Sequence, residues 1–483
     1  MGSNRRDFLR NTIMGAGLLT AGFTSQAASF SAESVSNRKE KNREQRFNMS
    51  GYAAPKLDKV RIGFVGLGMR GPGAVERMSY IDGVEIVALC DQYPDRVEAM
   101  QKLLEKQGLP KAISYSGSKD AWKKMCENPD IDLIYITTPW SWHTIMAVYA
   151  MEHGKHAATE VPAAVTIDEC WQLVETSERT KKHCMMLENC CYDFFELLTL
   201  NMARQGFFGN IVHGEGAYIH NLRDLNFNKT TGYAEMWRLK ENQHRNGNLY
   251  PTHGLGPICQ VMNINRGDQM EYLTSMSSAD FQMGVIAAEL AAKDSFYSEF
   301  NTNSYRGNMN TTTVRTYNGR TIMIQHDVTS QRVYSRLHLV SGTKGMASKY
   351  PDPRISTGHE WFKDDEMKKL EEQYTPEIVK LIGEMAKKIG GHGGMDFMMD
   401  WRLIDCLRNG LPLDENVYDA ALWSAIAPLS EKSVVNRSNS VDIPDFTCGS
   451  WKTNAPVELT LKGGGTTGVR EKKVDDSKQL NVK

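Results

Sequence analysis

Short apolar runs alternate with amphipathic stretches along the first part of the chain. Buried strands are predicted at residues 60–65, 84–91 and 131–137, with helices between them, for example at residues 94–107. Strands that alternate with helices favour a parallel, doubly wound sheet, in which ligands bind at the carboxyl ends of the strands. We therefore predict an α/β domain over residues 57–190.

The rhythm changes after residue 190. Strand-like segments now follow one another without regular helices between them, at residues 209–220, 273–279, 311–317, 321–328 and 336–340. This succession predicts an α+β domain with a mainly antiparallel, open sheet. Helices expected near residues 365–374, 376–388 and 395–409 would cover a face of that sheet. We assign residues 191–450 to this substrate and oligomerisation domain and residues 451–483 to a C-terminal tail.

The N-terminal residues 1–28 have the order of an export signal. Arg5 and Arg6 precede a short apolar stretch at residues 13–23, which is followed by small residues. This order resembles a bacterial twin-arginine signal and predicts export to the periplasm or the cell exterior. The alternative is an amphipathic N-terminal helix of a cytosolic protein. The apolar stretch is too short for a permanent membrane span, and the charge-rich residues 29–56 are predicted to form a polar linker.

Composition narrows the class of protein. A length of 483 residues favours two domains, and 41% hydrophobic and 24% charged residues are ordinary values for a globular chain. The net charge of −1 argues against nucleic acid as a partner. Nine cysteines without a CxxC spacing predict neither a disulfide framework nor a zinc site.

Two pairs of residues could suggest a metal site. They are His392 with Asp396, and His326 with Asp327. Neither pair has further ligands at a recognisable spacing, so we predict no metal.

A glycine motif directly follows the first predicted strand. In Gly66-x-Gly68-x-x-Gly71, the first glycine permits a tight turn, the second leaves room for a pyrophosphate, and the third lets helix pack on strand. Asp91 ends the second strand, where a carboxylate would accept from the ribose 2′-hydroxyl of NAD and repel the 2′-phosphate of NADP. The alternative is a structural glycine-rich turn. We predict a Rossmann-type domain that binds NAD.

Two further segments resemble the Gfo/Idh/MocA oxidoreductase family. They are Thr137-Thr-Pro-Trp140-Ser-Trp-His143 and Glu160-Val161-Pro162. In that family the second motif is normally Glu-Lys-Pro, and its lysine assists catalysis. Val161 occupies the lysine position, which argues against an ordinary alcohol dehydrogenase.

A narrower resemblance covers roughly residues 1–450. The segments that carry it are Glu160-Val-Pro-Ala163, Leu187-Glu-Asn189-Cys, Gly216-Ala-Tyr218, Trp237-Arg238, Tyr250-Pro-Thr-His253-Gly, Tyr334-Ser-Arg336, Ser341-Gly-Thr-Lys-Gly345 and His392-Gly-Gly-Met-Asp396. Together they are similar to glycoside hydrolase family 109, whose members are NAD-dependent α-N-acetylgalactosaminidases, mostly from bacteria.

The resemblance implies a set of site residues. Those expected to bind the cofactor are Gly66, Gly68, Met69, Arg70, Gly71, Asp91, Trp140, His143, Glu160, Val161, Asn189 and Tyr250. Those expected to bind the sugar are Tyr218, Arg238, Tyr250, His253 and Tyr334, and His253 and Tyr218 would be catalytic. Alternatives stay open: a structural histidine for His253, binding rather than base catalysis for Tyr218, and ion pairs for Arg238 and Glu160.

The implied reaction is a redox-neutral, retaining hydrolysis of terminal α-N-acetylgalactosamine from glycans. NAD-dependent glycosidases are an exception to the rule of two carboxylates. Transient oxidation at C3 acidifies the C2 proton, so that loss of this proton expels the aglycone from C1; water then adds and C3 is reduced again. The alternatives are a sugar or cyclitol dehydrogenase with net hydride transfer, and a non-catalytic sugar- or nucleotide-binding protein. Sheet pairing in the wider family suggests a homo-oligomer.

Overall fold

The structure, a computed structural model, describes residues 43–470. The predicted signal, residues 29–42 of the predicted linker and residues 471–483 lie outside the described residues. Within the described part, no helix is both long and apolar enough to cross a membrane.

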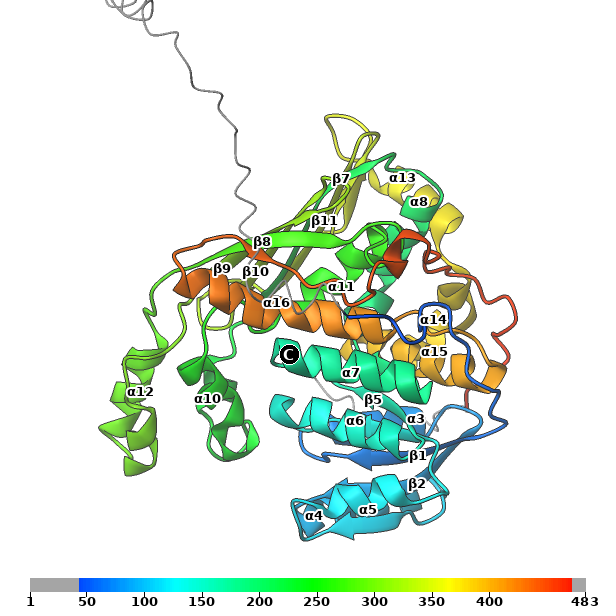
Figure 1. The fold of residues 1–483 in the computed structure, drawn as a ribbon, viewed down its shortest axis with the longest axis vertical. Coiled ribbons are helices and arrows are strands. Elements are labelled where there is room, and N and C mark those ends of the chain that lie inside the picture. Colours follow the sequence, from blue (N-terminus) through cyan, green and yellow to red (C-terminus); the bar gives the residue numbers. More distant parts are fainter. Residues whose placement is uncertain (1–42, 471–483) are drawn as a thin grey trace, which may run out of the picture. The chain divides into compact units, whose positions relative to one another are not determined.

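Residues 60–186 form a six-stranded sheet with the order β3-β2-β1-β4-β5-β6. Strands β1, β2 and β5 of this sheet are labelled in the lower part of Figure 1. Its strands are β1 (Val60–Val65), β2 (Val84–Asp91), β3 (Ile113–Ser116), β4 (Leu133–Ile136), β5 (His156–Thr159) and β6 (Cys184–Met186). The helices between them are α3 (Gly71–Met78), α4 (Pro94–Lys106), α5 (Ala121–Glu127), α6 (His143–Glu152) and α7 (Ile167–Thr180). All neighbouring strands are parallel. The predicted doubly wound sheet is confirmed.

Apart from Arg61, the residues of the central strands β1 and β4 are apolar or aromatic, because helices cover both faces of the sheet. All four residues of β4 are buried, as are five of the six residues of β1. A sheet buried on both faces needs continuous apolar strands rather than alternating ones. This burial fixes the loops that leave the carboxyl ends of β1 and β4.

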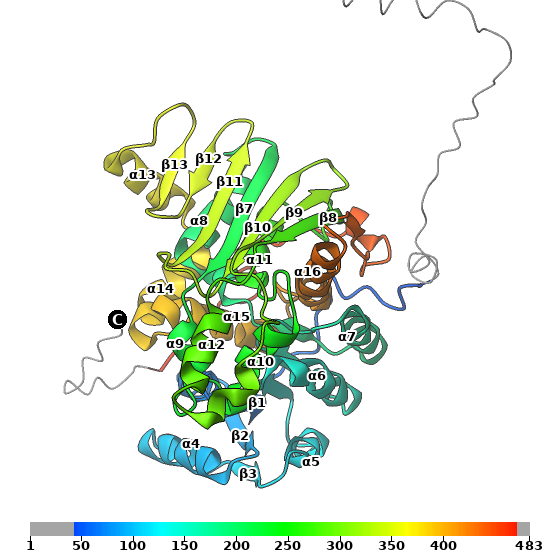
Figure 2. The same cartoon turned by 90° about the vertical axis from the view of Figure 1, so that its left-hand side faces the viewer.

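The second, larger part of the described chain forms an eight-stranded sheet with the order β13-β12-β11-β7-β10-β9-β8-β14 (Figure 2). Its strands are β7 (Ile211–Ile219), β8 (Met270–Ser277), β9 (Asn310–Thr316), β10 (Thr321–Asp327), β11 (Ser335–Gly342), β12 (Met346–Ser348), β13 (Arg354–Ser356) and β14 (Val441–Asp442). Only β7 and β10 pair in parallel among these strands of the described chain; the other pairs are antiparallel. The predicted α+β part with a mainly antiparallel sheet is confirmed.

The helices after residue 190 are more numerous than the sequence patterns predict. They are α8 (Phe194–Arg204), α9 (Arg223–Phe227), α10 (Trp237–His244), α11 (Thr252–Val261), α12 (Met283–Ala291), α13 (Asp364–Tyr374), α14 (Glu377–Ile389), α15 (Met395–Asn409) and α16 (Val417–Val435). Short 3₁₀ turns lie at η1 (Trp140–Trp142), η2 (Asn189–Tyr192), η3 (Ala234–Met236), η4 (Ser295–Phe300), η5 (His392–Gly394) and η6 (Ser450–Lys452).

The helices that pack on the second sheet are not the ones that we expected. Helix α11 packs on β7, β10 and β11, and α16 packs on β8 on one side and on α7 on the other. The helices expected to cover the sheet lie elsewhere: α15 packs on α3 and β1, α14 on α15, and α13 on α8. The expectation was wrong because α11 contains glycines and a proline, which conceal its helical periodicity in the sequence.

Helix α11 lies unusually close to strand β7 because glycines face each other. A Cβ added to Gly216 would lie 2.3 Å from the carbonyl oxygen of Gly254, and one added to Gly254 would lie 2.2 Å from the backbone nitrogen of Ala217. Neither position tolerates a side chain in this packing. The two glycines therefore set the distance between Tyr218 on the strand and His253 on the helix.

Candidate active site

A cavity of about 770 Å³ lies at the carboxyl ends of β1, β2, β4, β5 and β6, where the strand order reverses between β1 and β4. This is the place where doubly wound sheets bind ligands. Predicted residues on its nucleotide side are Gly66, Gly68, Met69, Arg70, Asp91, Trp140, His143, Glu160, Val161 and Asn189. On its other side, which we call the aromatic side, are Tyr218, Arg238, Tyr250 and His253. Gly71 and Tyr334, also described, are not in its lining.

The glycine turn after β1 fits a pyrophosphate. Gly66 has a φ of +90°, and a Cβ there would lie 2.7 Å from the carbonyl carbon of Thr137. A Cβ on Gly71 would lie 2.3 Å from the oxygen of Gly66, so α3 can start against the turn only with glycine there. Near Gly68 the closest atom is the tip of the Arg96 side chain, at 3.4 Å. The turn thus presents bare backbone to the cavity at the start of a helix, as phosphate binding requires.

Asp91 lies at the end of β2 and lines the cavity. Its carboxylate accepts hydrogen bonds from the backbone N–H of Leu67 at 2.7 Å and of Tyr93 at 2.9 Å, and Arg96 lies 3.5 Å away. The acidic group therefore supports the glycine turn as well as facing the position expected for a ribose. The bonds to Leu67 and Tyr93 hold it there without any ligand.

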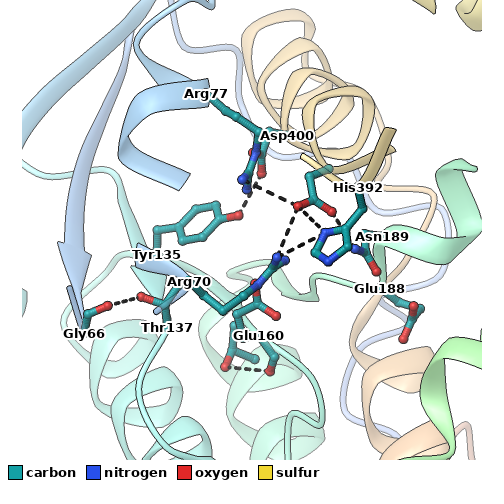
Figure 3. A network of polar contacts seen from close by, with 12 residues as sticks. Gly66, Arg70, Arg77, Tyr135, Thr137, Glu160, Glu188, Asn189, His392 and Asp400 are labelled. Carbon is teal, nitrogen blue, oxygen red and sulfur yellow. Dashed lines mark hydrogen bonds and ion pairs between the residues drawn. The ribbon is translucent and has the colours of Figure 1, made fainter. Parts of the chain in front are cut away.

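An ionic network joins the glycine turn to the start of α15 (Figure 3). Arg70 donates to Glu160 at 2.7 Å and to Asp396 at 3.2 Å. Burial alone raises the pKa of Asp396, but Arg70, His392 and Arg77 together hold it well below its ordinary value. Glu160 is thus in an ion pair, the alternative considered for it, while it also lines the cavity. The ion pairs with Glu160 and Asp396 hold the Arg70 side chain in position on the nucleotide side of the cavity.

His143 is held by its own domain. It is fully buried, and its Nδ1 and Nε2 lie 2.7 Å from the carbonyl oxygens of Pro162 and Thr138, respectively. These contacts connect the loops that follow β4 and β5. By contacting both loops, His143 holds them in position on the nucleotide side of the cavity.

Arg238 contacts several aromatic rings of the cavity. Its guanidinium lies 4.6 Å from the ring centroid of Tyr250 and 5.1 Å from that of Trp140, and Nη1 donates to the hydroxyl of Tyr233 at 2.6 Å. Nη2 is buried and has no hydrogen-bond partner among the described residues. Burying an unpaired charged donor is costly, so a ligand oxygen at this position would satisfy it.

Tyr218, Tyr250 and His253 form one aromatic cluster. Their ring centroids lie 4.7 to 5.4 Å apart. Burial raises the pKa of Tyr218, and the positive charge of Arg238 offsets this only in part. The hydroxyl of Tyr218 lies 3.0 Å from Nδ1 of His220, whose pKa is lowered to about 4 by burial and by Arg238. A neutral His220 accepts the hydrogen bond of a neutral Tyr218 at physiological pH.

His253 lies over a buried carboxylate. Its Nδ1 is 2.7 Å from Oε1 of Glu188, which is fully buried. Among the described residues, Glu188, Cys190 and His253 are the group whose ligand atoms come close enough to hold a metal ion. That arrangement suits a metal poorly, because Glu188 and His253 already bond each other and burial raises the pKa of Cys190 well above its ordinary value, which keeps the thiol protonated.

Several residues of the site were not among the predicted site residues, although Trp237, His392 and Glu188 lie in the segments that carry the family resemblance. His220, Tyr233, Trp237 and His392 line the cavity, and Glu188 lies directly beneath it. His220 could have been found, because residues two apart on a strand share a face and Tyr218 was already assigned. The others carry no such periodic signal. Tyr334 reaches the site indirectly, with its ring centroid 4.9 Å from that of His220.

Comparisons with known proteins agree with this architecture. The model described as glycosyl hydrolase 109, C-terminal domain, matches residues 192–453, and that described as oxidoreductase family, NAD-binding Rossmann fold, matches residues 60–188. A protein named glycosyl hydrolase family 109 protein 1 from Bacteroides thetaiotaomicron is 49% identical, over 92% of this chain and 97% of its own length. A protein named alpha-N-acetylgalactosaminidase from Bacteroides fragilis is 51% identical, over 83% of this chain and 95% of its own.

Solved structures show the same fold at low identity. An NAD-binding oxidoreductase from Klebsiella pneumoniae has a TM-score of 0.62 at 17% identity, over 80% of this chain and 100% of that one. A levoglucosan dehydrogenase in complex with NADH and L-sorbose has a TM-score of 0.59 at 15% identity, with the same coverage. Fold and site thus define an enzyme with an NAD-binding Rossmann domain of the Gfo/Idh/MocA type. Within that class, the chain belongs to glycosyl hydrolase family 109.

Proposed function

We propose that this enzyme removes terminal α-linked N-acetylgalactosamine from glycans by NAD-dependent, retaining hydrolysis. The observation that carries the proposal is that one cavity joins the NAD-binding strand ends to the cluster of Tyr218, Arg238, Tyr250 and His253. The name of the Bacteroides fragilis relative supports the choice of sugar. Val161 is buried and apolar where dehydrogenases of this fold carry a lysine, which argues against net alcohol oxidation.

The chemistry divides between cofactor and chain. Bound NAD supplies the reversible oxidation of the sugar's C3 hydroxyl to a ketone. Beside that ketone the C2 proton is acidic, so its removal forms an enolate and the C1–O bond to the aglycone breaks. Water then adds to the unsaturated ketone at C1, and C2 regains a proton. The chain must therefore hold the sugar and move protons at O3, at C2 and at the leaving oxygen.

His253 is the best placed group for proton transfer. An imidazole can both accept and donate a proton. In this structure Nδ1 of His253 contacts Glu188, and the ring borders the cavity. Tyr218 has a raised pKa, so it suits holding a sugar hydroxyl better than abstracting a proton unaided. Arg238 offers its unpaired Nη2 to a hydroxyl or to the acetamido carbonyl.

One assay separates the three candidate functions. The purified enzyme is incubated with a chromogenic α-N-acetylgalactosaminide in deuterated water, and aglycone release, NADH absorbance and deuterium at sugar C2 are followed. Release with deuterium at C2 and no net NADH is expected. Stoichiometric NADH without cleavage would instead establish a dehydrogenase, and neither signal with retained sugar binding would establish a binding protein.

Export and assembly belong to the same proposal. The sequence of residues 1–28 supports twin-arginine export in a bacterium. The substitution of Arg5 and Arg6 by lysine is expected to leave the enzyme in the cytoplasm, which cell fractionation measures. Pairing through the second sheet would give a homo-oligomer, and light scattering on the purified enzyme tests it.

A further inference from the structure

Glu188 occupies a fixed position beneath His253. Its side chain is fully buried; Oε1 lies 2.7 Å from Nδ1 of His253 and accepts from the backbone N–H of Cys190 at 3.1 Å. The residue belongs to the loop after β6, whereas His253 belongs to α11. The contact therefore connects the nucleotide-binding domain to the helix that carries the histidine.

The carboxylate is ionised although it is buried. Burial raises the pKa of Glu188, but His253 and the Cys190 N–H outweigh this and hold the pKa below its ordinary value. Glu415 lies beside it and accepts from the backbone N–H of Glu188 at 3.2 Å. Burial and the charge of Glu188 raise the pKa of Glu415 well above its ordinary value. The two pKa shifts have opposite directions, so Glu188 loses its proton before Glu415 does.

Packing holds Glu188 in place from the helix side as well. Gly256 follows His253 by almost one helical turn, and a Cβ there would lie 2.9 Å from Cγ of Glu188 and 3.0 Å from Trp423. Only a residue without a side chain lets α11 approach the buried carboxylate this closely. The sequence His253-Gly-Leu-Gly256 therefore provides both the histidine and the space for its partner.

We propose that Glu188 is a positioning residue that sets the tautomer of His253. An ionised carboxylate only accepts hydrogen bonds, so Nδ1 of His253 carries the proton and donates it to Glu188. In the neutral ring, Nε2 is then the free proton acceptor for the sugar, and the carboxylate stabilises the imidazolium formed when Nε2 takes a proton. This assignment rests on the proposed function and extends it.

The test is a double-mutant cycle of Glu188→Gln and His253→Ala, with Glu415→Gln as the matched control. Glutamine keeps the shape of the side chain but removes the charge and can donate to Nδ1, which selects the wrong tautomer. We expect Glu188→Gln to lower kcat about 10²-fold with KM changed less than about 3-fold. In the His253→Ala background it should lower kcat no further, and Glu415→Gln, which stays neutral, should be close to wild type.

Thermal unfolding of the same variants gives a readout that does not depend on turnover. His253→Ala leaves a buried charge without a partner and should lower Tm, and adding Glu188→Gln should restore part of that loss. Additive effects on both kcat and Tm would overturn the proposal. If wild type releases no aglycone, the proposed function fails, and the kinetic cycle is run on whichever signal, NADH or C2 exchange, the wild type gives.

Discussion

The nucleotide side of the cavity is made by loops that follow neighbouring strands of the first sheet. Its aromatic side is made by β7, α10 and α11, which follow that sheet in the sequence. The glycine turn on the first side exposes bare backbone, and the side chains beside it lie on loops that directly follow the strands. The second side depends on contacts between segments far apart in the sequence, such as His253 on Glu188 and Arg238 on Trp140. One side is therefore prepared to hold a cofactor, and the other to position reacting groups.

The largest effect should come from the aromatic side alone. We expect His253→Ala to lower kcat for aglycone release by about 10³-fold, because it removes the group that transfers the proton. Its NAD content should equal that of wild type, since the nucleotide side is untouched; extraction and quantification of bound nucleotide measure this. His213→Ala, on β7 but outside the cavity lining, serves as control. Loss of NAD together with activity would show that the two sides are not independent.

The second effect concerns the network that joins the two parts of the chain. Asp396→Asn should lower the free energy of unfolding by about 3 kcal/mol at pH 7, because Arg70 and Arg77 lose a buried partner. The pKa of Asp396 is depressed in the folded state, so its stabilisation exists above the unfolded value, about 4, and disappears as pH falls below it. The difference from wild type should therefore shrink below about pH 4.

Denaturant titrations at several pH values measure this difference. Asp365→Asn, at an exposed position on α13, provides a matched control that should stay within about 0.5 kcal/mol of wild type. A difference that is constant with pH would mean that the pKa of the Asp396 carboxyl is not lowered in the folded protein.

The sequence predicted the nucleotide side far better than the aromatic side. Gly66, Gly68, Gly71 and Asp91 follow two strands at fixed spacings, and local chain geometry alone places them together. Nothing local links Glu188 to His253, which are 65 residues apart. The aromatic residues were identified by family resemblance. Their partner Glu188 was missed because only tertiary packing brings it to His253. His220 and Tyr233 lie two and five residues from Tyr218 and Arg238, and the spacing of His220 could have revealed it.

The third effect tests whether close packing sets the geometry of the aromatic side. Gly216→Ala would place a methyl group 2.3 Å from the oxygen of Gly254, so α11 must move away from β7. We expect a loss of about 2 kcal/mol in the free energy of unfolding and a clear fall in kcat with NAD retained. Gly358→Ala, where a Cβ meets nothing within 4 Å, should change neither. Normal kcat in a destabilised Gly216→Ala would separate the packing of α11 from catalysis.

The smallest effect should come from the nucleotide side. Asp91→Asn keeps an oxygen that can accept from the N–H of Leu67 but removes the negative charge near the ribose. Arg96, 3.5 Å from Asp91, would then be free to attract a 2′-phosphate. We expect the preference for NADH over NADPH to fall about 10-fold, about 1.4 kcal/mol, in fluorescence titrations of the cofactor-free protein.

The control is Asp95→Asn, at an exposed position on α4, which should keep the wild-type preference. An unchanged preference in Asp91→Asn would mean that the carboxylate serves only to hold the glycine turn, and that the shape of the nucleotide side, rather than its charge, selects NAD.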